Sequence, residues 1–411
     1  MMNVRLSLLE PLTQAQLFAA VVVSALSVAE LADAGGYTHV GGQTVSDAKG
    51  RTYYVPECTP ACEHPPNWNL YWFNCASPVP GPCDSYGWIR PTNTPTWYAG
   101  AEMVAYRLHA DDDIVFARYG SDAASGQAGA VAVSTDNFDP DFSGGVRAFI
   151  GRQLGDWYRV EASYTGGLSW EEAYHLRDDT PNSLGGVGTL TTAIARFGDS
   201  EVAGLDYNDF VSVALRTEMD TVEINLRRKV AMPTPNAETS FLVGLRLSQI
   251  GENFGYRSFS NVPPVNGAIN ELAIDTDNDM VGVQLGMLGQ FLDRSRIWVD
   301  FEIKGSINHN QTSQSTSYTY TDNNNVTMSY LTSRDESRTT FTGEISLAAN
   351  CNFTRTLTLR GGYNVLWVGG LALAEENIPG NVTDLTAGPG TLFNDGELFF
   401  HGPFLGLTWV H

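Results

Sequence analysis

The feature that most constrains this chain is an alternation of apolar and polar side chains at every second residue, clearest from Thr356 to Gly370. The two faces read Leu357, Leu359, Gly361, Tyr363, Val365 and Trp367 on one side, and Thr358, Arg360, Gly362 and Asn364 on the other. Because successive side chains of a β-strand point to opposite faces, the pattern predicts a strand with apolar surroundings on one side and a polar space on the other. The segment is long enough to cross a bilayer, which takes roughly 9 to 11 tilted residues.

The alternation recurs from Trp97 to the C-terminus and predicts an all-β fold, a transmembrane up-and-down antiparallel β-barrel over residues 97 to 411. We expect ten strands, with twelve as the alternative count. The predicted strands are Trp97 to His109, Gly144 to Leu154, Trp157 to Trp170, Thr217 to Val230, Phe241 to Tyr256, Glu271 to Leu288, Arg296 to Asn308, Thr339 to Asn350, Leu357 to Leu371, and Glu397 to Val410.

The links between these strands alternate in length. Every second link is long and polar, and one of them is the Ser, Thr, Asn and Gln-rich stretch from Gln311 to Ser333. The others are short, such as Gly155-Asp156 and Asp293-Arg294-Ser295. Short turns on one rim and long loops on the other are typical of an outer-membrane barrel with its termini in the periplasm.

The two faces of the predicted strands differ in charge. The outward candidates are apolar, among them Val160, Ala162, Val222, Ile224, Leu226, Val243, Leu245, Leu247, Val281, Val283, Leu285, Ile297, Val299, Phe301, Ile303, Phe341, Ile345 and Leu347. The opposite face carries a lumen charge network of six basic and six acidic residues, namely Glu102, Arg147, Arg159, Glu161, Glu223, Arg227, Arg246, Asp300, Glu302, Lys304, Glu344 and Arg360. Opposite charges can meet across a narrow barrel, so the pattern favours a packed polar core over an open channel.

Residues 1 to 34 are typical of a cleaved secretory signal peptide. Arg5 precedes an apolar core from Leu17 to Val28, and Ala32-Asp33-Ala34 precedes Gly35. Without this segment the chain keeps 23 basic and 43 acidic residues, a net charge of −20. That charge argues against nucleic acid as a partner and favours contact with outer-membrane lipid and divalent cations.

Residues 35 to 96 form a Cys- and Pro-rich segment without sustained alternation, which we interpret as an irregular periplasmic extension. Cys58, Cys62, Cys75 and Cys83 are disulfide candidates with three connectivities open, since an exported protein meets an oxidising compartment. The rival interpretation is a metal or haem site. The spacing from Cys58 through Cys62 to His64 differs from the haem-attachment motif and fits no zinc finger.

Several short motifs resemble a family of β-barrel porins from planctomycete-type bacteria. They are Phe142 to Arg152 followed by Val160 to Tyr164, Val222 to Arg228, Phe241 to Arg246, Leu359 to Trp367 with Ala372, and Phe400 to Leu407. Their order and spacing carry the likeness over residues 97 to 411. The resemblance implies an outer-membrane barrel and implies no substrate. The Cys-rich extension lies outside the likeness, and the chain ends on Trp409-Val410-His411 instead of a terminal aromatic residue.

These observations predict a porin-like or structural envelope protein that passes small solutes at most, with no cofactor, no metal site and no enzymatic activity. The first alternative is a surface adhesin that binds through its acidic and Ser/Thr/Asn-rich external loops. The second is a barrel-embedded hydrolase built on His175 with Asp178 and Asp179 in the second long loop.

Three further patterns have a functional and a plain interpretation. Asp111-Asp112-Asp113 is either a calcium site or a hydrated loop, and Asp275, Asp277 and Asp279 resemble the start of a calcium loop but are predicted to be a polar kink or rim segment. Aromatic residues near strand ends predict a membrane girdle, namely Trp97, Tyr98, Trp157, Tyr158, Trp170, Trp367 and Trp409.

Overall fold

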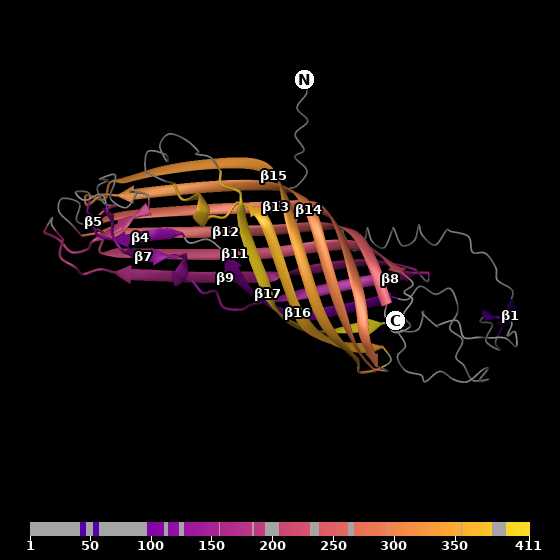
Figure 1. The fold of residues 1–411 in the computed structure, drawn as a ribbon. Helices are drawn as coiled ribbons and strands as arrows, with labels where there is room; N and C mark the ends of the chain where they lie inside the picture. Colours follow the sequence, from indigo (N-terminus) through magenta and orange to yellow (C-terminus); the bar gives the residue numbers. More distant parts are fainter. Residues whose placement is uncertain are drawn as a thin grey trace, which may run out of the picture.

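The structure is a computed structural model that describes residues 42–46, 52–56, 97–110, 114–122, 127–155, 157–182, 185–193, 205–230, 238–261, 267–294, 296–354, 356–379 and 392–411. Ten antiparallel strands close into a barrel in the order β11-β12-β13-β14-β15-β16-β17-β3-β8-β9 (Figure 1). The prediction of an all-β, ten-stranded antiparallel barrel is confirmed, and the alternative of twelve strands is wrong.

Strand length divides the barrel into two groups. Four strands are short: β3 Trp97–Ala110, β8 Ser143–Leu154, β16 Leu357–Leu371 and β17 Gly396–Val410. Six are long: β9 Tyr158–Arg177, β11 Phe210–Val230, β12 Glu238–Ser260, β13 Ala268–Arg294, β14 Ile297–Thr321 and β15 Thr327–Asn352. The six long strands continue beyond the closed barrel as a curved wall at the long-loop end (Figure 1).

The outer face of the barrel carries an apolar belt that ends abruptly. On β13 the outward side chains Val281, Val283 and Leu285 are apolar and exposed, whereas Asp279 and Asp277, further along the same face, are acidic and exposed. The belt continues on neighbouring strands through Val243, Leu245, Ile297, Ile303, Ile307, Phe341, Ile345 and Leu347. Exposed apolar side chains in a closed ring belong in a bilayer, so the change from Val281 to Asp279 marks where β13 leaves the hydrocarbon layer.

Part of the belt is shielded by its own neighbours. Ala162 and Val222 are buried, and Ile150, Ile224 and Leu247 pack against them. Ile224 and Ile150 are the register partners of Ala162 on the two adjacent strands, so all three side chains share the outer face.

Two sequence-based predictions of irregular structure are wrong, because the segments are mostly strand. The stretch from Gln311 to Ser333 is the end of β14, a turn at residues 322–326 and the start of β15. Asp275, Asp277 and Asp279 lie within the regular ladder of β13, so they form neither a kink nor a rim segment. In these two segments inward residues such as Asn278, Thr312 and Thr316 are polar like the outward ones, which hides the two-residue period although the ladder hydrogen bonds continue.

A glycine bulge reverses the facing of β9. The register of β9 against β11 shifts at Gly166 and Gly167, and Gly167 has a φ of 74°, a conformation that favours glycine. As a result Trp170 points into the lumen, where its indole nitrogen donates a hydrogen bond to the carbonyl of Tyr106 (2.9 Å). The prediction that Trp170 belongs to an outer aromatic girdle is therefore wrong.

The girdle prediction holds for Trp157, Tyr158 and Trp409, which are exposed at the short-turn end. It fails for Tyr98, which is buried and donates a hydrogen bond to Glu161. Arg152 lies over the Trp97 ring and Arg228 over the Tyr158 ring, with guanidinium-to-centroid distances of 5.2 and 5.8 Å. Aromatic rings beside arginines are typical of a membrane interface.

The long-loop end has its own apolar core. Three short strands, β4 Val115–Tyr119, β7 Val131–Ser134 and β10 Leu190–Thr192, form a small sheet in the order β10-β4-β7. Phe116, Val133 and Leu190 of this sheet pack on Phe254 and Ile274 of the wall. Figure 1 shows β4, β7 and the two-residue strand β5 Ser121–Asp122 at that end of the molecule. The strand β5 pairs with β6 Gln127–Ala128. The wall is thus covered on its inner side.

Within the N-terminal extension the structure describes one two-stranded sheet, β1 Gly42–Ser46 paired with β2 Thr52–Pro56. The disulfide candidates Cys58, Cys62, Cys75 and Cys83 and the triplet Asp111 to Asp113 lie outside the described residues. Among the described residues, no helix is both long and apolar enough to cross a membrane.

Prediction one concerns the belt. Leu285→Arg places a charge in the apolar belt and should lower the free energy of unfolding in lipid by about 2 to 4 kcal/mol. Asp277→Arg, on the same strand and face but above the belt, should change it by less than about 1 kcal/mol. Urea titration of the refolded barrel in vesicles measures both. Equal effects would show that the belt does not lie in the bilayer.

Candidate functional site

The structure places all twelve residues of the predicted lumen charge network on the inner face of the barrel. They come from eight strands: Glu102 on β3, Arg147 on β8, Arg159 and Glu161 on β9, Glu223 and Arg227 on β11, Arg246 on β12, Asp300, Glu302 and Lys304 on β14, Glu344 on β15 and Arg360 on β16. Each alternates with an outward residue of the belt, so the strand period puts them on the inner face, and the strand register brings partners such as Glu223 and Arg246 to the same level.

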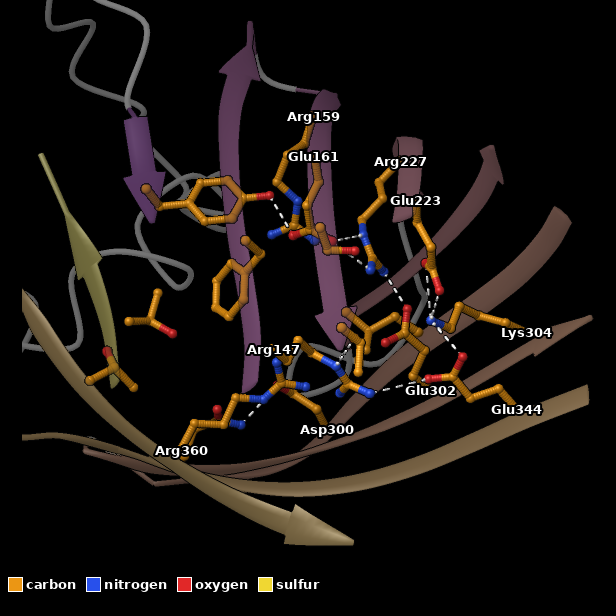
Figure 2. A pocket seen from close by; sticks show the side chains of 18 of the residues that line it. Arg147, Arg159, Glu161, Glu223, Arg227, Asp300, Glu302, Lys304, Glu344 and Arg360 are labelled. Atoms are coloured by element: carbon orange, nitrogen blue, oxygen red, sulfur yellow. Dashed lines mark hydrogen bonds and ion pairs between the residues drawn. The ribbon is translucent and has the colours of Figure 1, made fainter. Parts of the chain in front are cut away.

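The centre of the network is a four-residue cluster. The Lys304 ammonium lies 3.0 Å from a carboxylate oxygen of Glu223 and 3.0 Å from one of Glu344. The Arg246 guanidinium donates to the same two carboxylates, at 2.7 Å to Glu223. Figure 2 shows Lys304 between the two glutamates. Two positive and two negative charges therefore cancel, which is the condition for burying them.

Arg227 holds a second group of carboxylates together. Its guanidinium donates to Glu161 at 2.9 Å and to Glu302 at 2.6 Å, and the phenol of Tyr98 donates to the other oxygen of Glu161 at 2.7 Å (Figure 2). Arg159 lies over the Tyr98 ring at 5.5 Å.

A third group shares one carboxylate. Arg360 and Arg147 lie 3.1 and 3.5 Å from opposite oxygens of the buried Glu102. Both guanidiniums also lie over the Phe404 ring, at 5.4 and 5.8 Å from its centroid. One carboxylate thus serves two arginines, and the ring faces of Phe404 supply further negative potential.

Neutral residues complete the network, and sequence reasoning missed them. Gln284 donates to Glu223 at 3.0 Å, Asn225 donates to Glu223 at 3.0 Å, and Asn364 donates to the phenol oxygen of Tyr106 at 2.8 Å. Asn225 lies between Glu223 and Arg227 on the same inner face. The two-residue period therefore contained the signal, but a search for charged residues alone passed over it.

The twelve residues of the lumen charge network form one layer across the lumen, which we call the charged layer. Beyond it, towards the long loops, the lumen is filled by apolar side chains and by the chain after β16. Leu371 and Leu373 are fully buried in a cluster with Trp170, Met219 and Phe400. We call residues 371–377, which end in the 3-10 turn η3 Glu375–Asn377, the lumen plug.

Three side chains of the barrel and the plug hold the plug backbone in place. Asn278 accepts from the backbone N–H of Ala372 at 3.0 Å and donates to its carbonyl at 2.9 Å. Glu252 accepts from the N–H of Ala374 at 2.9 Å, and Asn377 donates to the carbonyl of Leu373 at 2.8 Å. Backbone groups inserted into a barrel need such partners, so the plug is a built-in part of the lumen.

A cavity of about 120 Å³ remains on the short-turn side of the charged layer. Its wall includes Tyr98, Trp298 and Val410, the inward residues nearest the strand ends on that rim, and Arg360 and Glu302 of the charged layer. One water needs roughly 10 to 15 Å³ by this measure. The cavity therefore has room for several waters or one small molecule, and it ends at the charged layer.

The residues of the hydrolase hypothesis do not converge. His175 lies on β9, not in a loop, and its exposed side chain points outward. Asp178 is buried and accepts hydrogen bonds from the backbone of Thr180 at 3.0 Å and of Thr189 at 2.6 Å. In the described part of the chain no hydrogen bond or ion pair joins His175 to either aspartate. Asp178 instead stabilises the second long loop through these hydrogen bonds.

No group of three or more His, Cys, Asp or Glu residues in the described ranges is arranged to hold a metal ion. Asp275, Asp277 and Asp279 form a row along the outer face of β13, where the strand period spaces them instead of converging them.

Comparisons with known proteins give structural neighbours but no family. No protein-family model matches the chain, and no curated protein sequence matches it. Among solved structures it is similar to the outer membrane protease OmpT from Escherichia coli, with 11% identity, 77% of this chain and 96% of that chain covered, and a TM-score of 0.39. It is also similar to a major outer membrane protein from Thermus thermophilus (11% identity, 78% and 100% covered, TM-score 0.26) and to a FadL homologue from Pseudomonas aeruginosa (9%, 77% and 90%, 0.22).

Likenesses at these scores support no inference about function. The first two neighbours are outer membrane proteins by name. The resemblance to planctomycete-type porins therefore stays a prediction beyond its barrel architecture.

Prediction two compares two arginines of β12. Arg246→Ala leaves Glu223 and Glu344 short of a buried partner and should lower the free energy of unfolding by about 3 to 5 kcal/mol. Arg257→Ala removes an exposed ion pair with Glu271 (3.2 Å) and should cost less than about 1 kcal/mol. Denaturant titrations in the same detergent give both values. Comparable losses would contradict burial of the Arg246 cluster.

Prediction three concerns Asp178. Burial alone would raise the pKa of this carboxyl, but hydrogen bonds from Thr180 and Thr189 outweigh it and hold the pKa below its ordinary value. A carboxyl with a lowered folded-state pKa stabilises the fold above its unfolded pKa of about 3.9 and loses that effect as the pH falls through the folded value. Protection of loop 178–209 against proteolysis should therefore be full at pH 7 and fall below about pH 4.

Asp178→Asn should lose most of this protection at pH 7 and its pH dependence, whereas the exposed neighbour variant Asp179→Asn should behave like the parent chain. Limited proteolysis followed by mass spectrometry measures the cleavage rates. Unchanged cleavage of Asp178→Asn would show that this carboxyl does not brace the loop.

Proposed function

We propose that this chain is an outer-membrane barrel that acts as a closed envelope protein and surface platform, not as a general diffusion pore. The observation that carries the proposal is the pairing of Lys304 and Arg246 with Glu223 and Glu344 across the lumen at the height of the apolar belt.

Two barriers in series support a closed lumen. The charged layer joins strands that are not neighbours in the barrel, since Arg246 of β12 meets Glu344 of β15 and Arg227 of β11 meets Glu302 of β14, each pair three strands apart. The plug then occupies the lumen above it, with Leu371, Leu373 and Ala374 fully buried. An aqueous path through the barrel would have to disrupt both.

The outer-membrane location is supported by the belt, by the arrangement of short turns and long strands, and by the predicted signal peptide of residues 1 to 34. In this orientation the short-turn end, the two barrel termini and the extension face the periplasm. The long wall and its covering sheet stand outside the cell.

A second candidate function is binding at the cell surface, as in the adhesin alternative. The outer face of the wall supports this candidate. The outer faces of β13 to β15 above the belt expose acidic and hydroxyl side chains such as Asp277, Ser333 and Asp335, together with Leu331, which is 75% exposed. Such a face suits divalent cations shared with lipid headgroups or a partner at the cell surface. We propose no catalytic role, because His175 points away from Asp178.

Prediction four tests closure by planar-bilayer recording. The parent chain should give no unitary conductance steps. The variant with Glu223, Arg246, Lys304 and Glu344 all changed to Ala should stay closed by the plug, and a variant with residues 372–379 replaced by a Gly-Ser link should stay closed by the charged layer. Only the combined variant should conduct.

Heat modifiability on gels serves as the control that each variant is folded. Reproducible steps from the folded parent chain would refute the closed-barrel proposal and restore the porin interpretation.

A further inference from the structure

The cavity at the short-turn end has polar groups that the protein itself leaves without partners. Within the described residues, Trp298 and Asp300 are about nineteen-twentieths buried, and neither the indole Nε1 of Trp298 nor Oδ1 of Asp300 has a hydrogen-bond partner. Both residues belong to the cavity wall. A buried donor or acceptor without a partner costs free energy, so such atoms are retained where something else can satisfy them.

Asp300 is unusual among the six lumen carboxylates. Glu102, Glu161, Glu223, Glu302 and Glu344 each have a cation within 4.0 Å. Over the described ranges Asp300 has no such ion pair, and its only hydrogen bond comes from the amide of Asn350 at 2.8 Å. Glu302, two residues further on the same face, receives Arg227 on Oε1 and no hydrogen bond on Oε2 from any described residue. Within the described ranges, this side of the cavity therefore keeps two carboxylate oxygens free to accept hydrogen bonds, although Arg159 and Arg227 also line the cavity.

On the other side of the cavity, two strands away on β16, Arg360 has donors unused by the described residues. Arg360 and Arg147 share the carboxylate of Glu102, and Arg147 also lies 3.7 Å from Glu344. Arg360 uses only Nη1 for that contact, its Nε has no partner among the described residues, and its side chain is 20% exposed. Arg360 also lines the cavity.

The strand register sets the distance between the β14 side and the β16 side of the cavity. Trp298 pairs with Asn350 and Asn350 pairs with Arg360, so the three residues lie in line across β14, β15 and β16. Adjacent strands are about 4.8 Å apart, which puts the backbones of Trp298 and Arg360 roughly 10 Å apart. Asp300 and Arg360 face the same cavity but do not form an ion pair, so a molecule between them can contact both.

We propose that this cavity is a binding site for a small zwitterion that carries an ammonium and a carboxylate group, such as a free amino acid with a short side chain. The ammonium donates to Asp300 and Glu302, and the carboxylate accepts from Arg360 and the indole N–H of Trp298. Access is from the short-turn end, the periplasmic side in the proposed orientation. The site borders the charged layer and shares Glu302 and Arg360 with it, but its ligand contacts do not include the cluster of Lys304, Arg246, Glu223 and Glu344 that carries closure.

Charge complementarity selects this ligand class. A lone cation would be repelled by Arg360 and Arg147, and a lone anion would be repelled by Asp300 and Glu302. Each would therefore be attracted on one side of the cavity and repelled on the other. A molecule with both charges can pair its ammonium group with the carboxylates and its carboxylate group with the arginines at the same time. The volume of about 120 Å³ limits the ligand to a handful of heavy atoms.

Isothermal titration of the full chain in detergent tests the site with glycine, methylammonium and acetate. Glycine should bind at least about tenfold more tightly than either singly charged probe, the effect of losing one charged hydrogen bond. Quenching of tryptophan fluorescence on glycine addition, absent in Trp298→Phe, reports binding at this wall.

Single substitutions test the two sides of the cavity separately. Asp300→Asn keeps the shape and should bind glycine no better than acetate, and Arg360→Gln should bind glycine no better than methylammonium. Asp335→Asn and Arg257→Gln, on the outer face, serve as matched controls and should bind like the parent chain.

Equal binding of glycine, acetate and methylammonium by the parent chain would overturn the proposal, and so would unchanged glycine binding in Asp300→Asn. Because Asp300→Asn removes no ion pair, it is expected to fold, and a heat-modifiability gel verifies this for each variant.

Discussion

The interaction on which the rest of this barrel depends is the meeting of Lys304 and Arg246 with Glu223 and Glu344 inside a ring of lipid-facing strands. At the height of the belt the usual arrangement of a protein is reversed, with apolar side chains outside and charges inside. Buried charges are tolerated only when they are paired and hydrogen bonded. The pairing therefore explains both why the bore is filled and why the filling residues come from strands that are not neighbours in the barrel.

Above the belt the arrangement returns to that of a water-soluble protein. The outer face of the wall becomes polar from Asp279 onward, while Phe254 and Ile274 on its inner face pack against the small sheet of β4, β7 and β10. One continuous set of strands thus passes through two environments, and the position where the outer face changes from Val281 to Asp279 is the boundary between them. The lumen plug joins the two levels, because Asn278 and Glu252 hold it from the wall side.

The sequence alone predicted the ten strands and the inward facing of the twelve charges, since both follow from a period of two. The alternation of short and long links predicted their up-and-down order. Sequence-based prediction failed where the period is hidden or broken. Between Gln311 and Ser333 both faces carry mostly Ser, Thr, Asn, Gln and Tyr side chains, so strand and loop have the same composition. At Gly166 and Gly167 a bulge reverses the facing, which moved Trp170 from a predicted girdle into the core. The plug and the neutral partners Gln284 and Asn364 depend on contacts between distant strands, which periodicity does not encode.

The most direct test of the closed lumen is a double-mutant cycle between Arg246 and Glu344, which lie on β12 and β15 and are far apart in the sequence. Denaturant titrations of Arg246→Ala, Glu344→Ala and the double variant give the coupling energy. Charges that meet across a filled bore should couple by about 1.5 kcal/mol or more, the lower end of values for close charge pairs. A coupling near zero would mean that the two side chains are separately hydrated in an open channel, and it would contradict a closed lumen.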